Sequence, residues 1–256
     1  MCQEEFEKIE LMARGGQKIV FDGVHNSYGE TVIKLYFQLN DPRSLREIQI
    51  ERDLNLSMVP KIYETGTIEY EGTETLYIIE QKVKGTELRK VLESGKRFSL
   101  EEAVTFLEQG LEFIACIENK GIVHRDIKPE NIFVSATGDF KLGDFGIART
   151  IEKTTFGMSK KGTYPYMAPE IYQGKESDIL VDMYSLGLVM YRMLNDNRLP
   201  FFPEYPKKVT YVDRENALYR RIQGETFPKP RHGGKELGNI VMKSCQYQKE
   251  DRYGSI

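Results

Sequence analysis

Three short polar motifs in the second half of the chain constrain its fold more than any other feature. The first runs from His124 to Asn131, the second is Asp144-Phe145-Gly146, and the third is Ala168-Pro169-Glu170. Between the first two lie 132–135 and 140–143, short runs rich in β-branched and aromatic residues, with a Gly and an Asp in the turn that separates them. This pattern predicts a β-hairpin that carries polar side chains at its open end.

The predicted hairpin would bring two oxygen-bearing side chains together. If its strands pair symmetrically about a four-residue turn at 136–139, Phe133 lies opposite Leu142. Asn131 and Asp144 then face each other about 5 Å apart. Oxygen ligands suit Mg²⁺, with Mn²⁺ as the alternative, whereas a zinc site would need Cys or His. The hairpin therefore predicts a metal site at Asn131 and Asp144.

A carboxylate and a lysine lie inside the first motif. Asp126 can accept the proton of an incoming hydroxyl group, and Lys128 can neutralise charge on a transferred phosphoryl group. Because phosphoryl transfer depends mainly on positioning and electrostatics, these few residues suffice for it. The motif therefore indicates phosphoryl transfer next to a bound metal ion.

On these motifs the chain resembles a eukaryotic-type protein kinase over nearly its whole length, and Lys128-Pro129 is similar to the serine/threonine-specific branch. The resemblance implies transfer of the γ-phosphoryl group of Mg-ATP to Ser or Thr hydroxyls of protein substrates. It implies that Asp126 is the catalytic base, that Lys128 contacts phosphate, and that Asn131 and Asp144 are metal ligands.

The implied fold is α+β and two-lobed, with a small β-rich N-lobe and a larger helical C-lobe. One catalytic domain would fill 1–256, with the N-lobe at about 1–82, the hinge at about 82–86 and the C-lobe from about 87 onward, the last helix being missing. The expected strands of the small lobe are Lys18–Phe21, Glu30–Phe37 and Leu76–Gln81.

The N-lobe resembles the family less closely. The family's glycine-rich loop is similar to 13–20, where only Gly15 keeps its register, so a plain hairpin turn is the alternative. Lys34 resembles the family's phosphate-binding lysine. Its partner should be a carboxylate on the next helix, where the count back from the following strand favours Glu47 over Glu51.

Two carboxylates complicate the expected nucleotide pocket. In the same alignment Glu51 replaces an apolar residue, and Glu80 lies at the gatekeeper position at the back of the pocket. A buried unpaired carboxylate is costly, which leaves three alternatives. Either one carboxyl group is protonated, or both share Lys34, or the helix is misaligned by a turn.

The resemblance also implies how the nucleotide binds. Val20, Val32 and Phe133 would sandwich the adenine ring, while the backbone of Lys82 and Val83 would form the hinge hydrogen bonds. ATP is therefore the expected nucleotide.

Regulation is expected from Arg125 and the segment that precedes Glu170. The Arg125 guanidinium could pair with a phosphorylated residue, and the alternative for each candidate hydroxyl is a solvated loop residue. The leading candidates are Thr154 and Thr155, ahead of Thr150 and Ser159. Thr163 resembles the threonine that contacts the catalytic base and favours hydroxyl substrates. Autophosphorylation between molecules would require transient self-association.

Other motifs indicate structural roles. Ser99 with Glu102 forms a capping-box pattern that begins a long core helix. Asp182 resembles the aspartate that braces the backbone of the catalytic loop, and Glu170 is expected to pair with Arg252.

Composition limits the partners and the compartment. The net charge of −3, without a basic cluster interleaved with aromatic residues, argues against nucleic acid. Three scattered cysteines fit a reducing compartment. The longest apolar run is too short to cross a bilayer. We therefore expect that this chain has no membrane segment and that it lies in the cytoplasm. An anchor in a longer parent protein stays open.

Two other functions stay open beside an active protein kinase. One is a scaffold that keeps the fold and the nucleotide but has lost catalysis, and the other is a kinase of small molecules. Glu87 and Glu130 align with carboxylates that bind basic residues in some kinase substrates, which raises the hypothesis of a basic-substrate preference.

Overall fold

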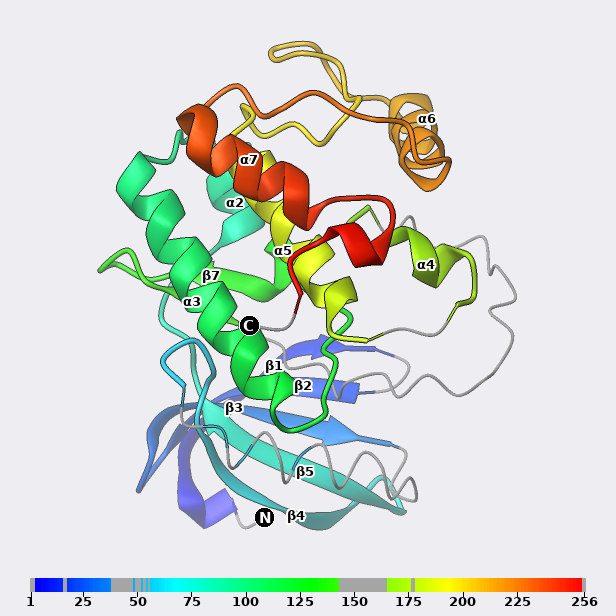
Figure 1. Ribbon diagram of the computed structural model, residues 1–256. Coiled ribbons are helices and arrows are strands. Elements are labelled where there is room, and N and C mark those ends of the chain that lie inside the picture. Colours follow the sequence, from blue (N-terminus) through cyan, green and yellow to red (C-terminus); the bar gives the residue numbers. More distant parts are fainter. Residues whose placement is uncertain are drawn as a thin grey trace. The chain divides into compact units, whose positions relative to one another are not determined.

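The computed structural model describes residues 3–15, 18–37, 48, 52, 54, 56–142, 165–175 and 178–254. The chain divides into two compact units, Met1–Lys84 and Gly85–Ile256. The first is built on an antiparallel sheet and the second is mainly helical (Figure 1). The α+β class predicted from the sequence is confirmed.

Five strands form the antiparallel sheet of the N-terminal unit, in the order β1-β2-β3-β5-β4. A short 3-10 turn, η1 (Gln3–Glu5), precedes them. The strands are β1 (Phe6–Arg14), β2 (Lys18–His25), β3 (Gly29–Tyr36), β4 (Ile62–Tyr70) and β5 (Thr73–Gln81).

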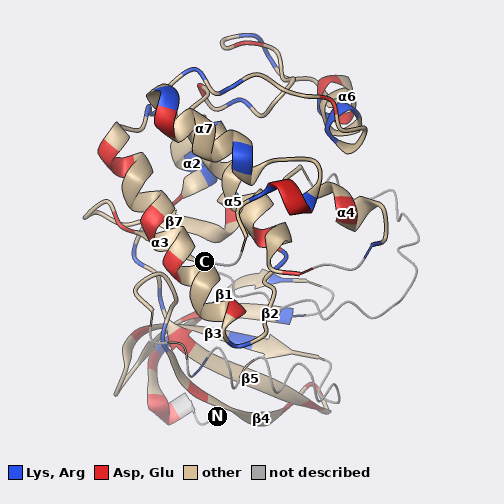
Figure 2. Ribbon diagram, in the orientation of Figure 1, with Lys and Arg blue, Asp and Glu red and all other residues tan. Residues whose placement is uncertain are grey.

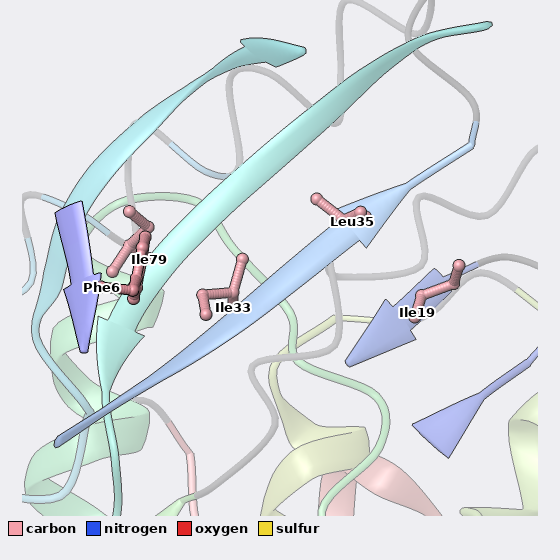
Figure 3. Packing of buried hydrophobic residues seen from close by; sticks show 5 residues of the cluster. All are labelled: Phe6, Ile19, Ile33, Leu35 and Ile79. Atoms are coloured by element: carbon pink, nitrogen blue, oxygen red, sulfur yellow. The ribbon is translucent and has the colours of Figure 1, made fainter. Parts of the chain in front are cut away.

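The three central strands give the sheet two chemically different faces, because successive side chains of a strand point to opposite sides. One face carries the buried apolar cluster shown in Figure 3, whose members are Phe6, Ile19, Ile33, Leu35 and Ile79. Burying each of these large side chains stabilises the fold by about 1.5–3 kcal/mol. The other face carries Val20, Val32 and Lys34, which alternate with the cluster residues along β2 and β3.

The sequence predicted β2, β3 and β5 as strands, and these are confirmed. It did not predict β1, whose residues are exposed after Phe6, so this edge strand has no alternation of buried and exposed positions to detect. Only the start of β4 was expected, at Ile62.

The C-terminal unit contains a small sheet, β6-β7-β8, and a set of helices. The strands are β6 (Thr86–Glu87), β7 (Ile132–Val134) and β8 (Phe140–Leu142). The helices are α2 (Leu88–Glu93), α3 (Leu100–Glu118), α4 (Pro169–Tyr172), α5 (Leu180–Met193), α6 (Tyr211–Ile222) and α7 (Gly234–Ser244), with the 3-10 turns η2 (Pro129–Asn131) and η3 (Lys249–Asp251).

Helix α5 is the centre of this unit, since almost all of its residues are buried. It packs against α3 and α7. Two glycines permit these close approaches: a Cβ atom at Gly110 of α3 would lie 2.7 Å from Leu186, and one at Gly187 of α5 would lie 2.8 Å from Cys245. The capping box predicted at the start of α3 is confirmed, because Ser99 and Glu102 each accept a hydrogen bond from the other's backbone N–H.

The charged positions of α3 are all glutamates, as Figure 2 shows in red. Among the described residues, no helix is both long enough and apolar enough to cross a membrane.

Candidate active site

The first polar motif folds into a compact cluster around Asp126. The Lys128 Nζ atom lies 2.7 and 2.8 Å from the two carboxylate oxygens of Asp126. Asn131 Nδ2 donates to the carboxylate at 2.8 Å and to the backbone oxygen of Asp126 at 2.9 Å. The side chains of Asp126 and Lys128 remain 37% and 32% exposed, so a substrate could reach them.

A buried carboxylate fixes the backbone that leads into this cluster. Asp182 of α5 accepts hydrogen bonds from the backbone N–H groups of His124 and Arg125, both at 2.6 Å. Burial raises the pKa of Asp182 to about 7, while these two N–H groups act in the opposite direction. Arg125 has a φ of 65°, a left-handed conformation that is costly for a non-glycine residue. The predicted brace between Asp182 and the loop is confirmed.

His124 has a structural place in the same loop. Its Nδ1 atom accepts a hydrogen bond from the Asp126 backbone N–H at 3.3 Å, and its ring meets Phe113 of α3 edge to face. The side chain is buried. His124 therefore orients the backbone of Asp126.

The hairpin after the loop forms, but the predicted register is wrong by one residue. Phe133 lies opposite Lys141, and Ile132 lies opposite Leu142. The turn is shorter than expected, because the Ser135 N–H donates to Asp139 O at 2.9 Å and Gly138 adopts a φ of 88°. This is a three-residue loop with glycine in the left-handed position, and it shifts the pairing relative to the assumed four-residue turn.

Asn131 provides one suitable group for a cation. Its amide nitrogen is engaged with Asp126, and its Oδ1 atom has no hydrogen bond among the described residues. A neutral amide oxygen beside a carboxylate fits a hard divalent cation such as Mg²⁺. The described part of the chain has no group of three His, Cys, Asp or Glu side chains arranged to hold a metal. The second predicted ligand, Asp144, is outside the described residues.

The N-terminal unit places Lys34 on β3 in contact with Glu80 on β5. Their Nζ and Oε1 atoms lie 2.7 Å apart, and both side chains are at least 95% buried, with 5% and 4% exposed. This contact is one half of the alternative in which both carboxylates share Lys34. The other carboxylate, Glu51, lies outside the described residues, so the choice among the three alternatives stays open. Val20 lies directly opposite Lys34, and Val32 directly opposite Glu80, on the same face of the sheet.

Gly15, the glycine that keeps the family's register, directly follows β1. The Gly15 N–H donates to Lys18 O at 2.9 Å, which closes the hairpin. After β5, the backbone N–H of Lys82 donates to Glu30 O at 3.3 Å, and its side chain pairs with Asp22 at 2.7 Å. Val83 follows it and is half-buried. In the C-terminal unit, Phe133 is half-buried on β7 opposite Glu87 of β6.

Several predicted site residues lie outside the described residues. They are Glu47 and Glu51 on the expected helix, Asp144 and Phe145, and the candidate regulatory residues Thr150, Thr154, Thr155, Ser159 and Thr163.

The third polar motif is joined to the end of the chain by the predicted ion pair. The Arg252 guanidinium donates two parallel hydrogen bonds to Glu170, at 2.6 and 2.8 Å. The two side chains are 0% and 7% exposed. The guanidinium also lies over the ring of Tyr184, 4.8 Å from its centre. The expected Glu170–Arg252 pair is confirmed.

Sequence reasoning missed a cation between the two carboxylates of the basic-substrate hypothesis. Arg89 Nε lies 2.7 Å from Glu87 and 4.0 Å from Glu130. The signal for it was present, because Arg89 follows Glu87 by two residues at the start of a helix. The local charge that was expected to attract basic residues is therefore partly neutralised within the chain.

Comparisons with known proteins find the family that the catalytic loop from His124 to Asn131 resembles. Residues 6–255 match the protein kinase domain family. The chain is 32% identical over 219 residues to "Probable serine/threonine-protein kinase PknB" of Corynebacterium glutamicum. The aligned residues cover 81% of this chain and 34% of that protein. It is 32% identical over 218 residues to the serine/threonine-protein kinase PknB of Mycobacterium tuberculosis, with 82% and 33% covered. The chain thus spans about a third of the length of these relatives. It belongs to the protein kinase domain family.

Proposed function

We propose that this chain is an ATP-dependent protein kinase that transfers the γ-phosphoryl group of Mg-ATP to Ser and Thr hydroxyls. The observation that carries the proposal is the Asp126, Lys128 and Asn131 cluster on a loop fixed by Asp182. Membership of the kinase family and the names of the relatives supply the substrate class.

The cluster supports a role for each of its side chains. The Asp126 carboxylate would accept the proton of the substrate hydroxyl as its oxygen attacks the γ-phosphorus, and ADP would leave. Lys128, held 2.7 Å from Asp126, would neutralise charge on the phosphoryl group during transfer. Asn131 and Asp144 would hold Mg²⁺, which when bound neutralises the phosphate oxygens.

The N-terminal unit would bind the nucleotide. Lys34 would contact the phosphates, with Glu47 as the helix carboxylate of the family pattern. Gly15, Val20 and Val32 would line the nucleotide with Phe133, and the backbone of Lys82 and Val83 would meet the adenine. Support comes from the sheet, which places Val20, Val32 and Lys34 on one face, opposite the apolar cluster.

Regulation belongs to the same proposal. Arg125 would bind a phosphate carried by Thr154 or Thr155, and Thr163 would contact the catalytic base. The hinge segment of the domain would be at about 82–86. Transient self-association would allow one chain to phosphorylate another, so the rate of incorporation per molecule should rise with protein concentration.

The test is phosphate incorporation from Mg-ATP into the chain and into a generic basic protein. Asp126→Asn keeps the size of the side chain and removes its charge, so it should lower the rate by about 10²- to 10⁴-fold. Glu112→Gln, an exposed charge removal on α3, is the matched control and should keep the wild-type rate. Measurable ATP binding without any incorporation by the wild-type chain would instead support the scaffold function.

A further inference from the structure

The Lys34–Glu80 ion pair lies in apolar surroundings. Glu80 is directly opposite Val32 on β3 and Ile62 on β4, while Lys34 is opposite Ile78 on β5. The two charged groups therefore meet diagonally across neighbouring strands. Ile62 and Ile78 are 4% and 2% exposed. Water has little access to either charge.

Burying an ion pair in the interior of a sheet is energetically unfavourable for folding. Removing both charges from water costs several kcal/mol per ion, and an apolar pair of similar volume would often be as stable or more so. Stability alone therefore does not explain a glutamate at this position. Loss of this carboxylate would shift the Lys34 amine towards its neutral form, which binds phosphate poorly.

We propose that Glu80 is a positioning residue for nucleotide binding, whose carboxylate keeps the Lys34 amine charged and held on the face of the sheet that also carries Val20 and Val32. This inference rests on the proposed function, because it assumes that Lys34 meets the phosphates of ATP. Glu80 itself need not touch the nucleotide. It would act through Lys34, by fixing where the positive charge is when the phosphates arrive.

Among the residues that the structure describes, the other charged groups on this face of the sheet are engaged elsewhere or lie farther along the strands; Glu47, Glu51 and Asp144 are outside these residues. Asp22 pairs with Lys82 at 2.7 Å, and Glu30 pairs with Lys84. Lys18 and Tyr36 form the pair two register positions beyond Lys34. Glu80 is thus the described carboxylate in direct contact with Lys34, whatever further contacts either residue makes.

The first test measures the protonation of Lys34 without any nucleotide. The lysine side chains are labelled with carbon-13 at Cε, and the Cε chemical shift of Lys34, assigned from Lys34→Arg, is followed by NMR over a pH series. In Glu80→Gln the midpoint pH of this titration should fall by about one unit or more. The control is Glu64→Gln, which removes a carboxylate that binds Tyr77 on the opposite face at 2.5 Å. Equal midpoints in the two variants would overturn the proposal.

The second test measures Mg-ATP affinity by calorimetry. Glu80→Gln should weaken binding about tenfold at neutral pH, and this loss should shrink as the pH falls and Lys34 regains its proton. A merely structural role would give a loss that does not change with pH, and that result would contradict the proposal. If the wild-type chain binds no ATP, the proposed function fails, while the NMR titration still decides whether Glu80 controls the protonation of Lys34.

A variant that folds poorly would still be informative. If Glu80→Gln lowers the thermal midpoint strongly, the double variant Lys34→Met/Glu80→Met should recover most of that loss, because it removes both charges of the pair together. Failure of the double variant to recover it would show that the two residues are not coupled.

Discussion

Two lysine–carboxylate pairs, one in each unit, have the same contact distance and different surroundings. In both, the nearest nitrogen and oxygen are 2.7 Å apart. The Lys34–Glu80 pair is at least 95% buried on a sheet, whereas about a third of each side chain of the Lys128–Asp126 pair is exposed on a loop. The same kind of ion pair is therefore buried in the N-terminal unit and accessible in the C-terminal unit.

The difference suggests a division of work. A buried ion pair is strongly destabilised when one partner is lost, so its geometry is reliable. A partly exposed pair contributes little to stability, and its partners can exchange a contact with each other for one with a substrate. We infer that the N-terminal pair prepares a fixed charge for a ligand, and that the C-terminal pair reacts with the ligand.

The largest effect on stability should come from the most buried pair of the C-terminal unit. Arg252→Met leaves Glu170 buried without its bidentate partner and should cost about 3–5 kcal/mol in the free energy of unfolding. Denaturant unfolding measures this loss. Lys249→Met breaks the nearby and partly exposed pair with Asp178 and should cost far less. A similar loss in the two variants would contradict the distinction by burial.

A second effect should appear in the pH dependence of stability. Burial raises the pKa of Asp182 from 3.8 to about 7, so the folded chain keeps a proton that the unfolded chain releases within this window. Stability contributed by this group is full below pH 3.8 and is lost as the pH rises towards 7. Asp182→Asn should reduce the loss of unfolding free energy between these two pH values by about 1 kcal/mol or more. Parallel slopes for wild type and variant, measured by denaturant unfolding, would show that Asp182 does not titrate there.

A smaller effect on stability is expected at the exposed catalytic pair. Lys128→Met should change the free energy of unfolding by about 1 kcal/mol or less, because water already solvates Asp126. Thermal unfolding checks this against Lys34→Met, which removes the cation in contact with the buried Glu80 carboxylate and should be much less stable. If Lys128→Met proves as damaging as Lys34→Met, the loop pair has a structural role that its exposure does not indicate.

The smallest effect concerns substrate choice. Arg89→Ala removes the cation between Glu87 and Glu130, so their charge becomes available to basic substrate residues. The ratio of kcat/KM for arginine-containing over acidic peptides should rise about two- to fivefold. Lys96→Ala, which breaks the pair with Glu102, is the matched control and should keep the ratio. An unchanged ratio in Arg89→Ala would remove these glutamates from substrate selection.

The catalytic loop could be predicted from the sequence because its motifs are continuous. Asp126, Lys128 and Asn131 lie within a few residues of each other, so one loop brings them together. The brace from Asp182 and the Glu170–Arg252 pair join distant segments. These two were predictable only through the resemblance to kinases, since no local pattern links the partners.

The remaining features depend on details that residue patterns do not carry. The hairpin register turned on whether three or four residues form the turn, which the left-handed Gly138 decides. Strand β1 has no buried face to reveal it. The Lys34–Glu80 contact depends on the register of β3 with β5, since Glu80 must lie opposite Val32 to reach Lys34 diagonally. Neither residue alone indicates that pairing.

The division of work between the two lysines is tested most directly by measuring Mg-ATP affinity and the single-turnover rate of phosphoryl transfer for Lys34→Met and Lys128→Met. The account predicts that Lys34→Met weakens ATP binding about tenfold or more. It predicts that Lys128→Met binds ATP nearly as the wild type does but transfers phosphate about 10²- to 10³-fold more slowly. Equal losses of affinity in both variants, or wild-type transfer by Lys128→Met, would contradict it.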